Sequence, residues 1–103
     1  MEFIETPLFQ KESRKVLSDD QLRQLQTTLL LYPAMGAVIP ESGGLRKLRW
    51  VSAGKGKRGG LRVIYYWVTH DHKIFLLYLY TKAKQEDLTS AELKFLKTLI
   101  EEE

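Results

Sequence analysis

Hydrophobic positions recur at helical spacing through the first third of the chain. Phe3, Ile4 and Glu5 precede them and predict a short strand. The helical stripe is formed by Leu22, Leu25 and Leu29. Pro33 ends this pattern, because the residue before a proline avoids helical geometry. We therefore expect a strand at residues 3–5 followed by a helical hairpin with one apolar face.

Two polar residues mark where the predicted helices begin. Thr6 precedes Pro7, and a proline at the first helical position costs nothing because its missing N–H has no partner there. Ser18 is followed three residues later by Gln21, which is the pattern of a capping box. The first helix should therefore start at Pro7 and end near residue 16, and the second should follow Ser18.

From residue 45 the pattern changes to the alternation of a strand. Within residues 45–51, Leu48 and Trp50 fall on one face, whereas Lys47 and Arg49 fall on the other. This predicts a strand with one apolar face and one basic face.

Two longer strands and a helix complete the pattern. Residues 61–69 are apolar on both sides and predict a central strand, and a turn at residues 70–72 leads to an antiparallel strand over residues 73–81. Thr89, with Glu92 three residues later, predicts the start of a last helix. Its apolar face consists of Leu93, Leu96 and Ile100.

The order of these elements predicts the fold class. A strand, a helical hairpin, a three-stranded meander and a C-terminal helix indicate an α+β fold, in which the N-terminal strand and the hairpin pack on a mainly antiparallel sheet. We expect the helices on one face of that sheet. Residues 33–44 should form a loop without a helix or a long strand. A chain of 103 residues should form a single domain, residues 1–103.

Composition excludes several classes of function. The chain contains no cysteine, which excludes disulfides, thiolate zinc sites and cysteine nucleophiles. His70 and His72 flank Asp71 in a predicted turn with too few further ligands for a metal site, so we expect neither a metal nor another cofactor. Acids at the N-terminus and short apolar runs predict a cytoplasmic protein without a membrane partner.

The net charge of +3 hides an uneven distribution. Between Ser42 and His70 there is no acid, and the basic residues are Arg46, Lys47, Arg49, Lys55, Lys57, Arg58 and Arg62. The nine remaining basic residues are outnumbered by 13 acids elsewhere. Such a surface suits nucleic acid or an acidic protein, and the alternative is a solvated lysine-rich loop.

Arg62 stands out because it lies one residue into an apolar central strand. A positively charged side chain is disfavoured there unless it has an ionic partner or a functional role. Lys47 and Arg49 can stand beside it on the neighbouring strand, which predicts a phosphate clamp. The alternative is a structural arginine paired with Glu86 or Asp87.

Several motifs together resemble a known family. Residues 43–50 (GGLRKLRW), 54–60 (GKGKRGG) and 62–66 (RVIYY) resemble the HigB branch of the RelE/ParE toxin superfamily, and residues 76–82 and 87–89 continue the likeness. The resemblance covers nearly the whole chain and implies a RelE-like fold.

The resemblance also implies an activity and partners. Its members include ribosome-dependent endoribonucleases that cut messenger RNA in the decoding site, by metal-independent attack of a 2′-hydroxyl on the adjacent phosphate. The implied partners are messenger RNA on the ribosome, with ribosomal RNA contacting the basic loop, and a cognate antitoxin that is itself expected to bind DNA. The toxin is expected to be monomeric until the antitoxin binds.

The resemblance implies roles for individual residues. Arg62 matches the arginine that holds the scissile phosphate, and Lys47 and Arg49 match basic positions on the preceding strand. Lys82 matches a residue that supports the leaving 5′ oxygen as an acid or through its charge. The expected contacts to RNA or the ribosome are Arg46, Lys55, Lys57, Arg58 and Lys84.

The general base is the least defined role. Leu88 stands where the best-known members carry a tyrosine, so either Tyr80 takes over that role or this chain lacks it. A further hypothesis gives the role to Lys47, because neighbouring cations disfavour the protonated form of a lysine.

Other functions remain open from the sequence. A ParE-like toxin that poisons DNA gyrase shares the fold but not the chemistry, and the basic positions through Lys82 favour the ribonuclease. A non-catalytic nucleic-acid-binding module would show salt-dependent binding without cleavage. A protein-interaction domain would need an acidic partner for the basic surface.

Overall fold

A computed structural model describes residues 1–50 and 60–101 of the chain. The elements are β1 (Glu2–Glu5), α1 (Pro7–Val16), α2 (Asp19–Leu31), β2 (Ala37–Val38), β3 (Arg46–Trp50), β4 (Leu61–Val68), a 3₁₀ turn (Thr69–Asp71), β5 (Lys73–Thr81) and α3 (Ser90–Glu101). No helix in this part of the chain has the length and apolar character needed to cross a bilayer. The predicted α+β fold class is confirmed.

The predicted helix starts are confirmed by their caps. The Thr6 hydroxyl accepts a hydrogen bond from the Phe9 N–H, at 2.9 Å, with Pro7 at the start of α1. Ser18 and Gln21 form both bonds of the capping box of α2. These caps satisfy backbone donors that a helix leaves unpaired at its N-terminus.

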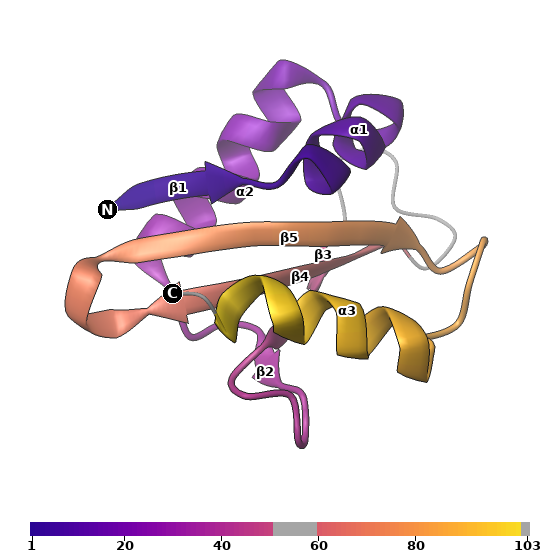
Figure 1. Cartoon of the computed structure of the whole chain (residues 1–103). Coiled ribbons are helices and arrows are strands. Elements are labelled where there is room, and N and C mark those ends of the chain that lie inside the picture. Colours follow the sequence, from indigo (N-terminus) through magenta and orange to yellow (C-terminus); the bar gives the residue numbers. More distant parts are fainter. Residues whose placement is uncertain (51–59, 102–103) are drawn as a thin grey trace.

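The five strands form one sheet in the order β1-β5-β4-β3-β2 (Figure 1). β4 is central, as predicted from its apolar residues. β1 runs parallel to β5, and the other neighbours are antiparallel. The sequence did not predict β2, a two-residue edge strand that pairs with β3.

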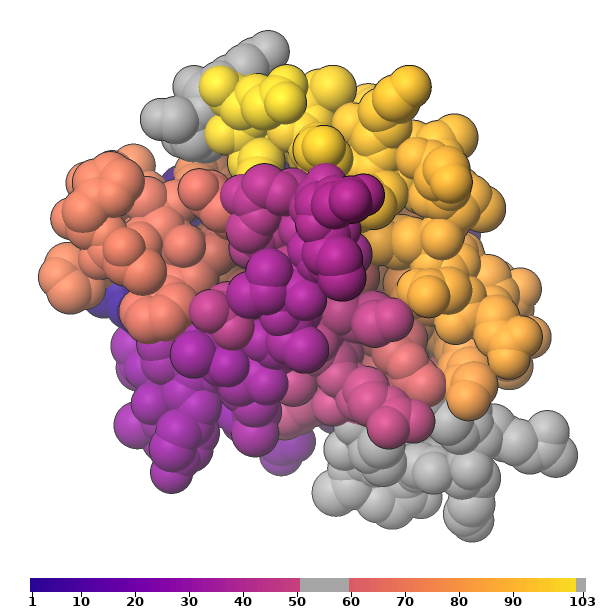
Figure 2. Space-filling model, turned by 90° about the horizontal axis from the view of Figure 1, so that it is seen from below, coloured from indigo at the N-terminus to yellow at the C-terminus, as the bar shows by residue number. Residues whose placement is uncertain are grey.

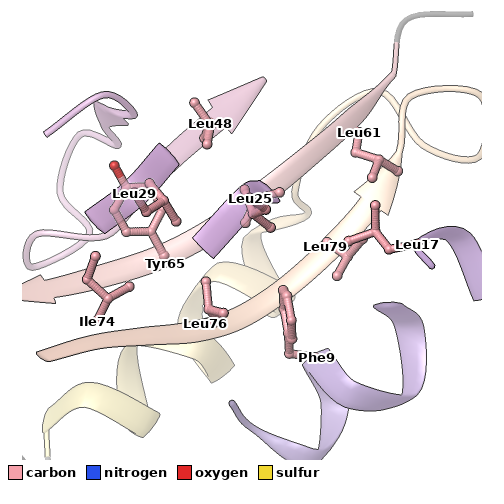
Figure 3. Packing of buried hydrophobic residues seen from close by; sticks show 11 residues of the cluster. Phe9, Leu17, Leu25, Leu29, Leu48, Leu61, Tyr65, Ile74, Leu76 and Leu79 are labelled. Atoms are coloured by element: carbon pink, nitrogen blue, oxygen red, sulfur yellow. The ribbon is translucent and has the colours of Figure 1, made fainter. Parts of the chain in front are cut away.

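The prediction that all helices lie on one face of the sheet is wrong. α1 and α2 cover one face, where Phe9, Leu25 and Leu29 pack against residues such as Leu48, Tyr65 and Leu76 (Figure 3). α3 covers the other face through Leu96 and Ile100 (Figure 1). β4 and β5 are apolar on both sides because each side faces a helix layer, and each layer buries its own hydrophobic cluster.

Candidate active site

Strand register brings three predicted site residues into one row. Arg62 on β4 lies opposite Arg49 of β3 on one side and opposite Tyr80 of β5 on the other. Directly opposed residues of neighbouring strands share a face, and here it is the face that α3 covers, since Tyr80 belongs to the cluster beneath α3. Lys47, two residues from Arg49 on β3, lies on the same face.

Asp87 joins two of these side chains. It lies in the segment between β5 and α3, and its Oδ1 atom accepts hydrogen bonds from the Lys47 Nζ at 3.2 Å and the Tyr80 hydroxyl at 3.4 Å. The same oxygen accepts a third bond from the Leu88 N–H at 2.8 Å. One carboxylate therefore holds a lysine from β3 and a tyrosine from β5.

These contacts set the charge states of the acid and the tyrosine. The Leu88 N–H and then the Lys47 ammonium hold the pKa of Asp87 below its ordinary value. Burial, followed by the charge of Asp87, raises the pKa of Tyr80 to about 12. At neutral pH, Asp87 is therefore an ionised acceptor and Tyr80 a neutral donor, which makes Tyr80 a poor general base.

The two arginines in the row differ in exposure. Arg62 is 6% exposed, and its positive charge acts to lower the pKa of Tyr80 against the larger effect of burial. Arg49 is exposed. Their planar guanidinium groups have the geometry to bind an anion such as phosphate.

A cleft of about 360 Å³ lies beside Lys47 and Asp87. Its other lining residues are Ala37, Val38, Ile39, Pro40, Leu88 and Leu93. Figure 2 shows the surface around the cleft, where the segment that contains β2 lies beside α3 and beside the segment that precedes α3. The cleft thus combines apolar walls with one cation and one carboxylate.

Comparison with protein-family models identifies the family of this chain. The family model described as "RelE toxin of RelE / RelB toxin-antitoxin system" matches residues 1–102. The chain belongs to the RelE toxin family. The predicted resemblance to RelE is thereby confirmed.

Three solved structures share the RelE fold with this chain at low sequence identity. The intact E. coli RelBE toxin–antitoxin complex matches with a TM-score of 0.59 and 18% identity, covering 78% of this chain and 94% of that chain. A free mutant of E. coli RelE matches with a TM-score of 0.60 and 19% identity, covering 82% and 86%. Isolated E. coli RelE matches with a TM-score of 0.59 and 17% identity, covering 96% and 98%.

Two further basic residues of this RelE-family chain lie at the same end of the sheet as Arg62. The Lys82 N–H donates to the carbonyl oxygen of Gly60 at 3.2 Å, which places Lys82 beside the start of β4. Lys84 follows in the same segment and is exposed. Lys55, Lys57 and Arg58 lie outside the described residues.

Arg46 is not brought into this row. It lies on the face that α1 and α2 cover, where its guanidinium donates to the carbonyl oxygens of Ala34 and Gly36 at 3.2 and 2.7 Å. It also lies over the Trp67 ring, 5.9 Å from the ring centroid. These contacts give Arg46 a structural task in holding the turn after α2.

Sequence reasoning missed the role of Asp87 as a shared acceptor. It weighed Asp87 only as a partner of Arg62, whereas the structure pairs it with Lys47. The ion pair joins residues 40 positions apart, so no local pattern reports it. Across residues 1–50 and 60–101, no group of three or more His, Cys, Asp or Glu side chains is arranged to hold a metal ion.

Proposed function

We propose that this chain is the toxin of a toxin–antitoxin pair and that it cleaves messenger RNA on the ribosome. The observation that carries the proposal is the row of Arg49, Arg62 and Tyr80 beside the Lys47–Asp87 pair. The planar guanidinium groups of these two opposed arginines suit phosphate. The likeness to the HigB branch matches Arg62 to the arginine that holds the scissile phosphate, and Lys47 and Arg49 to basic positions on the preceding strand.

The proposed reaction needs alignment, charge stabilisation and two proton transfers. The 2′-hydroxyl oxygen attacks the adjacent phosphorus, and the bond to the 5′ oxygen breaks, which leaves a 2′,3′-cyclic phosphate and a 5′-hydroxyl. Arg49 and Arg62 stabilise the charge that develops on the phosphate oxygens. Lys82 protonates the leaving 5′ oxygen. No step requires a metal ion.

We propose that Asp87 is the general base that accepts the proton of the 2′-hydroxyl. Tyr80 is neutral at physiological pH because its pKa is raised to about 12. Lys47 is engaged as an ammonium in the ion pair with Asp87, an arrangement that suits a cationic role. Asp87 has a lowered pKa, which limits its strength as a base, so charge stabilisation has to supply most of the acceleration.

The proposal of an antitoxin partner is based on the family of the chain rather than on the geometry of the site. One structure of similar fold is a RelBE toxin–antitoxin complex. By analogy, we propose a cognate antitoxin that binds this chain and blocks its cationic row. An exposed Arg49 and the open cleft beside Lys47 are the features such a partner would cover.

The deciding experiment is primer extension on a defined message, with and without ribosomes. We expect cuts only with ribosomes, and a loss of about 10²- to 10³-fold in cutting rate for Arg62→Ala, the range for removing one charge-stabilising group. Arg23→Ala is the matched control, because Arg23 is an exposed arginine of α2 that pairs with Asp20. Its cutting should equal that of the parent.

Each alternative function has its own outcome in this experiment. Undiminished cutting by Arg62→Ala would remove the row from the mechanism. Salt-dependent RNA binding without any cut would favour a non-catalytic binding module. Trapped complexes of DNA gyrase on DNA, without RNA cuts, would favour a ParE-like toxin. Lys47→Arg should keep most of the cutting activity. If this variant lost all cutting activity, Lys47 would again be the candidate general base.

A further inference from the structure

The segment between β5 and α3 carries Asp87 but contains neither helix nor strand. Backbone hydrogen bonds from the N–H groups of Lys84 and Gln85 to the Thr81 carbonyl oxygen form a turn at its start, and side-chain contacts hold the rest. Gln85 makes three of them. Its Oε1 accepts from the Tyr78 hydroxyl at 3.3 Å, and its Nε2 donates to the Asp87 carbonyl oxygen at 2.9 Å and to Glu92 Oε1 at 3.0 Å.

The hydrogen-bonding partners of Gln85 require an amide side chain at this position. The Asp87 carbonyl and the Glu92 carboxylate can only accept hydrogen bonds, so both must face the NH₂ group of Gln85. This fixes the orientation of the amide, which is otherwise ambiguous for glutamine. Tyr78 then donates to the remaining oxygen. A glutamate in place of Gln85 would lack both donors.

The three contacts reach three parts of the site. Tyr78 belongs to β5, where its ring centroid lies 5.8 Å from that of Tyr80. Glu92 belongs to the first turn of α3 and also accepts from the Thr89 N–H at 2.9 Å. Asp87 is held through its main chain, while its carboxylate faces Lys47 and Tyr80. Gln85 thus ties the Asp87 backbone to both neighbouring elements.

We propose that Gln85 is a positioning residue, which holds the Asp87 main chain so that its carboxylate meets Lys47 and Tyr80. The effect on cutting rests on the function proposed above. The effect on the placement of Asp87 does not. A displacement of about 1 Å at a reacting group can lower a rate by about a hundredfold, so the loss of these bonds should act mainly on kcat.

The test replaces Gln85 by methionine, which keeps the length of the side chain and adds no charge. Gln26→Met is the matched control, because Gln26 is a part-buried glutamine that donates to Glu5 at 3.3 Å, on α2. For Gln85→Met we expect kcat on ribosome-bound message to fall about tenfold to a hundredfold. KM should stay within about twofold, because Arg49 and Arg62 remain to bind the phosphate. The control should keep both constants.

A carboxyl NMR titration of Asp87 gives a readout that does not depend on cutting. In Gln85→Met the pKa of Asp87 should rise towards its ordinary value, because the carboxylate no longer meets its donors in the same geometry. An unchanged Asp87 pKa would overturn the positioning role, and an unchanged kcat in an active parent would overturn its effect on cutting. A parent that cuts no message would refute the proposed function alone, and the titration would still decide the role of Gln85.

A milder variant guards against loss of the fold. Tyr78→Phe keeps the ring and removes only the hydroxyl that the Gln85 oxygen accepts. As in Gln85→Met, we expect kcat to fall and the pKa of Asp87 to rise, but by smaller amounts. If Gln85→Met does not fold, an unchanged titration of Asp87 in Tyr78→Phe would overturn the positioning role.

Discussion

The two faces of the sheet are built from the same strands but differ in what they bury. On the face that α1 and α2 cover, the polar groups of the cluster are the hydroxyl of Tyr65 and the indole N–H groups of Trp50 and Trp67, which pack against it. On the face that α3 covers, Arg62 and Tyr80 are each only 6% exposed at the end where β4 begins. One face buries an apolar core, and the other buries a core together with a charged arginine and a tyrosine that bonds to a carboxylate.

The two buried tyrosines show what this difference means. The Tyr65 hydroxyl donates to the Pro33 carbonyl oxygen at 2.7 Å and accepts from the Gly36 N–H at 2.8 Å, so both of its partners are main-chain groups that do not titrate. Tyr80 bonds to the carboxylate of Asp87. The first network fixes the turn after α2. The second holds groups whose charge can respond to a substrate or to pH.

The largest effect should come from opening a cavity on the α1–α2 face. Phe9 is fully buried there, and Phe9→Ala should lower the free energy of unfolding by about 3–5 kcal/mol, as measured by urea denaturation. The matched control is Phe95→Ala on α3, where Phe95 is 53% exposed, and its effect should stay within about 0.5 kcal/mol. Equal losses in the two variants would contradict the assigned core.

A smaller effect should separate the two tyrosines. Tyr65→Phe leaves the part-buried Pro33 carbonyl and the buried Gly36 N–H without this partner, which should cost about 1–3 kcal/mol of stability and leave the cutting rate per folded molecule unchanged. Tyr80→Phe should cost less, because Asp87 keeps Lys47 and Leu88 as donors. Its cutting rate should nevertheless fall about tenfold, since Asp87 loses one group that orients it. If Tyr65→Phe lowered the cutting rate and Tyr80→Phe lowered only the stability, the catalytic groups would lie on the face that α1 and α2 cover.

The sequence predicted the elements better than their arrangement. Helix starts at Pro7 and after Ser18 depend on neighbours within three residues, and the structure confirms them. The apolar stripe of α3 shows that the helix has a buried side but not which face of the sheet it meets. That choice depends on where residues 82–89 cross the end of the sheet, which no local pattern reports. β2 has two residues, too few for an alternation to show.

The candidate site was predictable where strand alternation decides it. The alternation that placed Lys47 and Arg49 on one face also places Arg46 on the other, with Leu48 and Trp50, so that signal was present in the sequence. The row of Arg49, Arg62 and Tyr80 needs the register between strands as well. Asp87 could not be placed, because its partners come from distant parts of the chain.

The smallest expected effect is a dependence of stability on acid at Asp87. The Leu88 N–H and then Lys47 lower the pKa of this carboxyl from its ordinary value of 3.8, so these contacts stabilise the fold above that value. The contribution is lost as the pH falls through the lower, folded-state pKa. Because the Asp87 side chain is 67% exposed, we expect less than about 1 kcal/mol, reduced further by salt.

Asp87→Asn isolates this contribution, because the amide oxygen can still accept from the Leu88 N–H while the charge is gone. The difference in free energy of unfolding between the parent and Asp87→Asn should be measurable at neutral pH and should vanish well below pH 3.8. The corresponding difference for Tyr65→Phe should persist over the same range, because the main-chain partners of Tyr65 carry no titratable charge. If both differences vanished together in acid, the loss would reflect the whole fold rather than the face that α3 covers.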